Sequence, residues 1–129
     1  MIEHPHAKLA HTAWEAAARG DSETLAQCCS EDLVWHASGR GLRSGAYRGL
    51  AETLDYLSTI GGAAENFESE FEDVLIGEDR VALLFHVSGR RRGRVLDTDF
   101  ILLFRVDAGK IAEVWAVPRD QHAVDEFWA

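Results

Sequence analysis

The chain has 129 residues, which is enough for one domain with its own hydrophobic core. Its 22 Asp and Glu residues against 13 Lys and Arg residues give a formal net charge of −9 at pH 7. Nucleic acid and anionic membranes bind basic surfaces, so we expect neither as a partner. No apolar run reaches the roughly 20 residues that a membrane-spanning helix needs.

The first six residues lack the basic start and the apolar stretch of a secretory signal peptide. The only cysteines, Cys28 and Cys29, are adjacent and so cannot crosslink distant segments. We interpret them as small apolar residues on a helix rather than as a redox pair. These features favour a cytoplasmic protein.

The first half of the chain has helical periodicity. Alanines and Trp14 recur at helical spacing after Pro5, and Gly20 ends that segment. Asp21 is a typical N-cap residue for a second helix. The expected elements are a helix over 4–19, a helix from Asp21, a strand over 33–37, a glycine-rich loop over 39–49, and a helix over 50–60 closed by Gly61 and Gly62.

The second half changes to the period of β-strands. Turn residues separate four apolar segments, and Pro118 ends the last of them before a polar, then aromatic, tail over 120–129. The expected strands cover 67–76, 81–88, 95–106 and 111–117. Three helices followed by strands joined by hairpins predict a single α+β domain over 1–129, with helices on one face of an antiparallel sheet.

Alternation along the strands divides the side chains into two faces. In the last strand, Val114 and Ala116 share one face with Ala112, which leaves space above the sheet. Ile111, Glu113, Trp115 and Val117 share the other face. The strand over 95–106 is apolar on both faces at its middle, and helices cover only one. We therefore predict a homodimer through the face that bears Trp115.

Four segments carry a resemblance to a known family, and the resemblance covers essentially the whole chain. They are Ala18–Asp21, Ser30–His36, Ser44–Gly49 and Phe104–Trp115. With them the chain resembles the SnoaL-like branch of the NTF2-like superfamily, which also contains ketosteroid isomerases and limonene epoxide hydrolases. The resemblance implies a cone-shaped fold in which helices and a curved sheet enclose one apolar pocket. It also implies a frequent dimer and no cofactor, while leaving the reaction to be argued from the site.

The ketosteroid isomerase mechanism needs a carboxylate base, a donor tyrosine and a second, neutral carboxylic acid. Matched segment by segment, the resemblance puts these positions on Ala37, near Thr12 and on Ile101. None of the three groups is retained, so we do not expect that mechanism.

Asp99 is the sharpest catalytic candidate. It shares a strand face with Ile101 and Leu103, and the resemblance implies that this face lines the pocket. A carboxylate among apolar neighbours has a raised pKa, which suits a general acid or base near neutral pH. The alternative is a structural Asp held by backbone donors or by Arg94 or Arg105.

Two histidines are candidate partners for Asp99. His36 follows Trp35 on the first strand, and alternation lets only one of these two side chains face the pocket. His86 lies mid-strand, where a pairing with Asp99 would form an acid/base dyad. The alternative for each is a structural histidine held by hydrogen bonds. Substrate-binding candidates are Trp14, Trp35, Tyr47, Tyr56, Ile101, Leu103, Val114 and Ala116.

Three further motifs do not carry a functional prediction. His4, His6 and His11 do not converge on one helical face, so we expect no metal site. The basic run over 90–94 is expected at a hairpin tip and not at a nucleic-acid site. The glycine-rich stretch over 39–45 is expected to form a rim over the pocket mouth.

Two hypotheses follow. The first is a cofactor-independent isomerase or cyclase that moves protons on an apolar carbonyl or polyketide-like substrate, through Asp99 with His36 or His86. Within this class, an epoxide hydrolase-like reaction would use Asp97, Arg105 and Asp99, which share a face. The second hypothesis is a dimeric protein that binds a hydrophobic ligand without transforming it.

Overall fold

The computed structural model describes residues 4–129, and the fold is of the predicted α+β class. In chain order its elements are α1 (Pro5–Arg19), α2 (Ser22–Cys28), β1 (Cys29–Ala37), β2 (Gly45–Arg48), α3 (Leu50–Ala63), β3 (Glu65–Ile76), β4 (Arg80–Arg91), β5 (Arg94–Asp107), β6 (Lys110–Pro118) and α4 (Gln121–Trp128). Within the described residues, no helix is long and apolar enough to cross a membrane.

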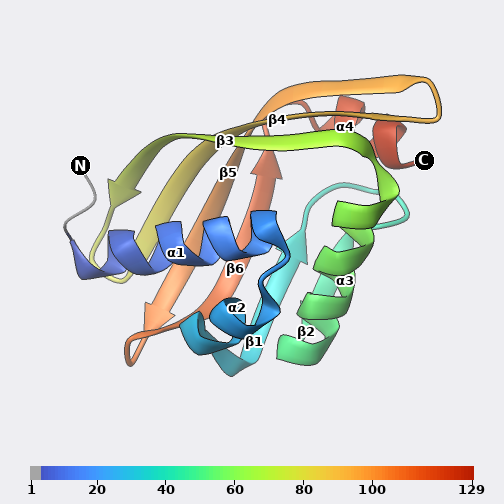
Figure 1. Cartoon of the computed structure of the whole chain (residues 1–129). Helices are drawn as coiled ribbons and strands as arrows, with labels where there is room; N and C mark the ends of the chain where they lie inside the picture. The colour runs from blue at the N-terminus through green and yellow to red at the C-terminus, as the bar shows by residue number, and fades with distance from the viewer. Residues whose placement is uncertain (1–3) are drawn as a thin grey trace.

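The strands form one curved, unclosed six-stranded sheet in the order β2-β1-β6-β5-β4-β3. Neighbouring strands are antiparallel except for β1 and β6, which are parallel. Figure 1 shows α1 lying across the concave side of the sheet, with α3 beside β1 and β2 at the other end. The predicted mainly antiparallel sheet with three N-terminal helices is confirmed.

The first helix follows its sequence signals closely. The His4 side chain caps its start by accepting a hydrogen bond from the His6 backbone N–H, and Gly20 ends it at a φ of 74°. One stripe of the helix consists of alanines that are almost fully buried. Because alanine is small, this stripe lets α1 lie close to β3 and β4. The stripe consists of Ala7, Ala10, Ala13 and Ala16.

Two elements lie where the sequence predicted none. The short strand β2 falls inside the glycine-rich segment that was expected to be a loop, and it pairs with β1. The helix α4 occupies the tail, with Asp120 as N-cap accepting a hydrogen bond from the Ala123 N–H at 3.0 Å. Its signal is in the sequence, because Val124 and Phe127 follow Ala123 at the spacing of an amphipathic helix.

A register shift in β6 corrects one predicted face. Arg105 pairs with Glu113, but the next residue, Val106, pairs with Ile111. The extra residue is a β-bulge, which rotates the start of the strand relative to its end. Ile111 is therefore fully buried in the core instead of sharing a face with Glu113. Alternation alone cannot reveal such an insertion.

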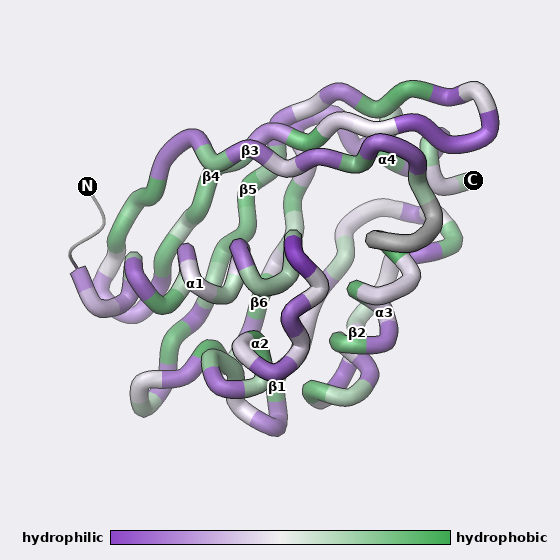
Figure 2. Tube along the Cα trace, in the orientation of Figure 1, coloured by the Kyte–Doolittle hydropathy of each residue, from purple (hydrophilic) through white to green (hydrophobic). Residues whose placement is uncertain are grey.

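The two faces of β4 and β5 differ in what covers them. Phe85 and Val87 of β4 and Phe100 and Leu102 of β5 point toward the helices, and this side is called the cavity face. The opposite side, called the outer face, carries His86, Asp99, Ile101, Leu103 and Trp115. Figure 2 shows the resulting mixture of apolar and polar residues along these strands.

The prediction that the Asp99 face lines the pocket is therefore wrong. Ile101 is 41% exposed on the outer face, whereas its neighbour Leu102 is 4% exposed on the cavity face. The face that includes Leu96, Phe100 and Leu102 is the more uniformly apolar of the two. The hydrophobic effect favours burial of that face, whereas the family resemblance had implied burial of the face that bears Asp99.

Candidate functional site

An apolar cavity of about 180 Å³ lies between the cavity face, α1, α3 and α4. Strands supply its floor and helices supply its walls, so rigid elements hold most of the lining. Most of its wall is carbon surface, because seven aromatic side chains converge from different elements. These are Trp14, Trp35, Tyr56, Phe67, Phe85, Phe100 and Trp128.

Four of the predicted substrate-binding residues line this cavity. They are Trp14 of α1, Trp35 of β1, Tyr56 of α3 and Ala116 of β6. The small Ala116 side chain leaves space above the sheet, as its strand pattern predicted.

The other four predicted binding residues lie elsewhere. Val114 is 1% exposed within the core beneath the cavity. Tyr47 stacks on Tyr56 with ring centroids 4.1 Å apart, and it supports the cavity wall from behind. Ile101 and Leu103 lie on the outer face and do not line the cavity.

The structure resolves the choice between Trp35 and His36. The Trp35 ring faces the cavity and is 6% exposed. Its indole Nε1, like that of Trp14, is buried and has no hydrogen-bond partner among the residues that the structure describes. A buried N–H without an acceptor costs free energy, so both tryptophans carry an unpaired donor within the packed wall of the cavity.

Polar residues at one end of the cavity come from the segment over 38–44 and from α4. Asp125 accepts a hydrogen bond from Gln121 Nε2 at 3.0 Å, and its other oxygen accepts from a backbone N–H of that segment at 3.1 Å. Gln121 Nε2 also donates to the Ser38 carbonyl oxygen at 3.2 Å. Ser44 and Arg43 complete this end, so the predicted rim at the cavity is confirmed.

Sequence reasoning missed the contribution of α4 to the site. Gln121, Asp125 and Trp128 all line the cavity, but their segment was interpreted as a tail. The helical spacing of apolar residues after Asp120 would have found the helix. The contact of that helix with a loop more than 80 residues away is visible only in the fold.

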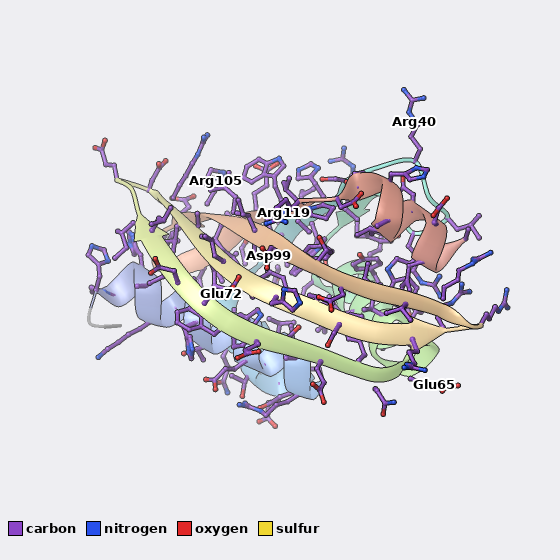
Figure 3. The ribbon with its side chains drawn as sticks, turned by 90° about the horizontal axis from the view of Figure 1, so that it is seen from above. Arg40, Glu65, Glu72, Asp99, Arg105 and Arg119 are labelled. Atoms are coloured by element: carbon purple, nitrogen blue, oxygen red, sulfur yellow. The ribbon has the colours of Figure 1, made fainter. Side chains whose placement is uncertain are left out.

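The predicted pairing of His86 with Asp99 exists, but on the outer face. His86 Nδ1 lies 2.7 Å from Asp99 Oδ1, and His86 Nε2 lies 2.5 Å from Asp97 Oδ1. Arg119 donates to the second Asp99 oxygen at 3.2 Å (Figure 3). The hydrogen bond to Asp99, followed by that to Asp97, raises the pKa of His86. The hydrogen bond from His86 lowers the pKa of Asp99, the reverse of the desolvation effect expected from sequence.

His36 belongs to a second polar cluster on the outer face. Its Nε2 lies 2.6 Å from a Glu113 oxygen, and its ring stacks on Trp115 with centroids 5.3 Å apart. Arg105 donates to the other Glu113 oxygen at 3.3 Å. These hydrogen bonds, the one from His36 first, lower the pKa of Glu113.

The arrangement predicted for an epoxide hydrolase-like site is not assembled. Arg105 binds Glu113, while Asp97 and Asp99 bind His86. All of these side chains lie on the outer face, outside the cavity. Catalytic roles for Asp99, His36 and His86 stay predictions that the cavity does not support.

The cavity can bind a ring-bearing molecule through apolar contact and direct a few polar groups at it. Burial raises the pKa of Tyr56 to about 12, so its phenol stays protonated near neutral pH. Asp125 is the carboxylate among the described lining residues. Within residues 4–129, no three His, Cys, Asp or Glu side chains form a group that could hold a metal ion.

Comparisons with known proteins agree on the family. The SnoaL-like domain pattern matches residues 10–114. An uncharacterized protein from Mycobacterium tuberculosis is 29% identical over 131 residues, and the match covers 100% of both chains.

Solved structures agree on the fold. The protein Bal32a, from a soil-derived mobile gene cassette, superposes with a TM-score of 0.90 at 26% identity over 97% of both chains. An NTF2-like protein from Burkholderia xenovorans has a TM-score of 0.85 at 20% identity and full coverage of both. TerC, co-crystallized with polyporic acid, has a TM-score of 0.83 at 17% identity, covering 96% of this chain and 98% of its own.

The matched domain thus includes most of the elements that build the cavity, from α1 through β6. The chain belongs to the SnoaL-like domain family and has the NTF2-like fold.

Proposed function

We propose that this protein binds a small, apolar, ring-bearing molecule in the cavity between the sheet and α1, α3 and α4. The observation that carries the proposal is the cavity itself, whose wall is built from aromatic side chains of seven different elements. A wall of this kind provides a bound molecule with apolar contact area and ring stacking, and neither needs a cofactor. The structure of TerC with polyporic acid supports the proposal, because it shows a ring-bearing organic acid with a protein of this fold.

Native mass spectrometry of the wild type and ligand binding by a variant with a filled cavity test this proposal. We expect freshly purified protein to carry a small organic adduct, or to acquire one from a panel of ketones and polyketide mimics. Ala116→Phe places a ring into the cavity and should reduce ligand binding at least about tenfold, because it removes the space and overpacks the wall. Ala51→Phe, on the exposed side of α3, is the matched control and should bind as the wild type does. Equal binding by both variants would contradict the proposal.

Proton transfer on the bound molecule is the second candidate function. The isomerase or cyclase hypothesis needs an acid/base group in the cavity, and Asp125 is positioned there from α4. Gln121 and a backbone N–H each donate a hydrogen bond to one of its oxygens, so the carboxylate is held in a fixed orientation at the cavity wall. We propose that any isomerase or cyclase activity on a polyketide-like carbonyl compound runs through Asp125.

The variant Asp125→Asn separates binding from turnover. It keeps the shape and one oxygen of the side chain but removes the base, so turnover of a found substrate should fall by about 100-fold or more while binding changes little. Unchanged turnover in Asp125→Asn would overturn the proton-transfer hypothesis and leave ligand binding as the function.

We also propose a homodimer through the outer face and a cytoplasmic location. The support for the dimer is apolar surface on the face that the helices leave bare, where Ile101 is 41% and Val117 is 44% exposed. The support for the location is the pair of buried, free cysteines. Light scattering at micromolar concentration tests the dimer, and a monomer would count against it.

A further inference from the structure

Two arginine side chains from distant segments meet at one tryptophan of the cavity wall. The Arg43 guanidinium carbon lies 4.6 Å from the centroid of the Trp128 ring, and that of Arg91 lies 5.8 Å from the same ring. Arg43 follows the loop over 38–42, and Arg91 ends β4 at the hairpin tip. Figure 1 shows that tip beside α4, and Figure 2 shows that it is hydrophilic. Both Trp128 and Arg43 line the cavity.

Neither guanidinium pairs with an Asp or Glu side chain in the part of the chain that the structure describes. The arginine ion pairs there are formed by Arg19, Arg105 and Arg119. Arg91 donates to the backbone oxygens of Phe127 and Ala129, which holds the end of α4. The Arg43 guanidinium donates to no described protein atom, and only its backbone carbonyl is used, by the Tyr47 hydroxyl.

Positive charge accumulates at this end of the cavity, although the chain carries a net charge of −9. Burial, followed by repulsion from Arg92, Arg43 and Arg94, lowers the pKa of Arg91. Arg91 and Arg94 both donate to the Ala129 oxygen at 2.9 Å, whereas Arg43, at the cavity, takes no part in these hydrogen bonds.

The cavity wall also contains polar groups whose hydrogen bonding is incomplete. The indole Nε1 groups of Trp14 and Trp35 are buried without a partner, and Trp35 is only 6% exposed. The Asp125 carboxylate, the acceptor at this end, already receives hydrogen bonds on both oxygens. Among these groups, the Arg43 guanidinium lines the cavity without a described hydrogen-bond acceptor, and an oxygen acceptor on a ligand would supply one.

We propose that the cavity selects ring-bearing molecules that carry an anionic oxygen group, such as a carboxylate, enolate or sulfonate, and that the Arg43 guanidinium binds this group. The rings lie against the aromatic wall, and the anion lies at the Arg43 end beside Trp128. The inference rests on the proposed ligand-binding function and adds its charge selectivity. Because Arg91 is occupied by the end of α4, Arg43 is the residue that determines the selectivity.

Two fluorescent probes that differ by one charged group test this proposal. Anilinonaphthalene sulfonate and phenylnaphthylamine share their ring system, and only the first carries an anion. We expect the wild type to bind the sulfonate at least about tenfold more tightly, as a charge-assisted hydrogen bond in a partly buried site allows. Arg43→Gln should abolish most of this preference while changing binding of the neutral probe by less than about twofold. Arg43→Lys keeps the charge and should restore part of the preference.

A neighbouring arginine supplies the matched control. Arg40 lies on the same segment, but its side chain projects away from the protein into solvent (Figure 3). Arg40→Gln removes the same charge from the chain without touching the cavity. It should leave the ratio of the two affinities unchanged, so a general charge effect and a site effect are separated.

The outcomes distinguish this inference from the function it rests on. Loss of both probes in Ala116→Phe places them in the cavity and supports the proposed function. Equal binding of the two probes by wild type, or an unchanged ratio in Arg43→Gln, would overturn the charge selectivity while binding in the cavity still held. If Ala116→Phe instead leaves both affinities unchanged, the probes bind elsewhere and both proposals fail.

Discussion

The cavity face and the outer face of one sheet use their polar residues in opposite ways. On the outer face, His86 and His36 have carboxylate partners within 2.7 Å, and arginines bind the remaining oxygens of Asp99 and Glu113. On the cavity side, the indole N–H groups and the Arg43 guanidinium have no described partner.

The difference shows that conspicuous titratable residues do not by themselves mark a site. Paired charges on a half-exposed strand face satisfy one another, whereas an unpaired guanidinium in a concave apolar wall is available to a ligand. The useful signal for ligand binding is therefore the unmet hydrogen-bonding capacity of the cavity, and the outer face has little of it.

Neighbouring leucines on β4 give the largest expected contrast between the two faces. Leu83 is fully buried on the cavity side, while Leu84 is half-buried on the outer face. Leu83→Ala should lower the free energy of unfolding by about 3 kcal/mol, and Leu84→Ala by less than about 1 kcal/mol, since only the first leaves a closed cavity. Urea unfolding measures both. Equal losses would mean that the outer face is as well packed as the core.

The proposed dimer gives the next contrast. Ile101→Lys puts a charge in the middle of the outer face, where a second copy would bury it without a partner. Self-association should weaken at least about tenfold, as measured by sedimentation equilibrium. Leu42→Lys is the control, because Leu42 is 82% exposed on the loop away from that face. If both variants associate as the wild type does, the dimer uses another surface.

The free energy of unfolding should depend on pH through His86, because its hydrogen bonds to Asp99 and Asp97 change its pKa on folding. Its folded pKa is raised above the ordinary value of 6.5. The stabilisation is therefore fully present below pH 6.5 and is lost as the pH rises through the higher folded pKa. The difference in unfolding free energy between wild type and His86→Gln should shrink as the pH rises from 6 to 9. A difference that grows over this range would contradict the paired geometry.

The smallest expected effects are those of the outer face on ligand binding. Asp99→Asn and His36→Gln change groups that do not line the cavity, so affinity for the cavity probes should change by less than about twofold. Probe titration of both variants beside Ala116→Phe measures this directly. A loss in Asp99→Asn comparable to that in Ala116→Phe would return Asp99 to the candidate site.

The sequence by itself determined the class of the fold and most of its elements. Helical spacing, N-cap residues and turn chemistry are local signals, which is why α1, the start of α2 and the four C-terminal strands were predicted close to their observed bounds. The expected end of α3 was wrong, because the helix continues through Gly61 and Gly62 to Ala63. Aromatic character and strand alternation gave eight candidate lining residues, and the cavity contains four of them, Trp14, Trp35, Tyr56 and Ala116.

Only the tertiary structure decided which strand face lines the cavity and which polar groups reach it. Strand alternation sorts residues into two sets but does not say which set the helices cover, and the bulge at Ile111 shifts the pattern without a local signal. The contacts of Arg43, Asp125 and Trp128 join segments that are more than 80 residues apart in the chain. Packing of the whole domain determines such contacts, because no local interaction within either segment favours them.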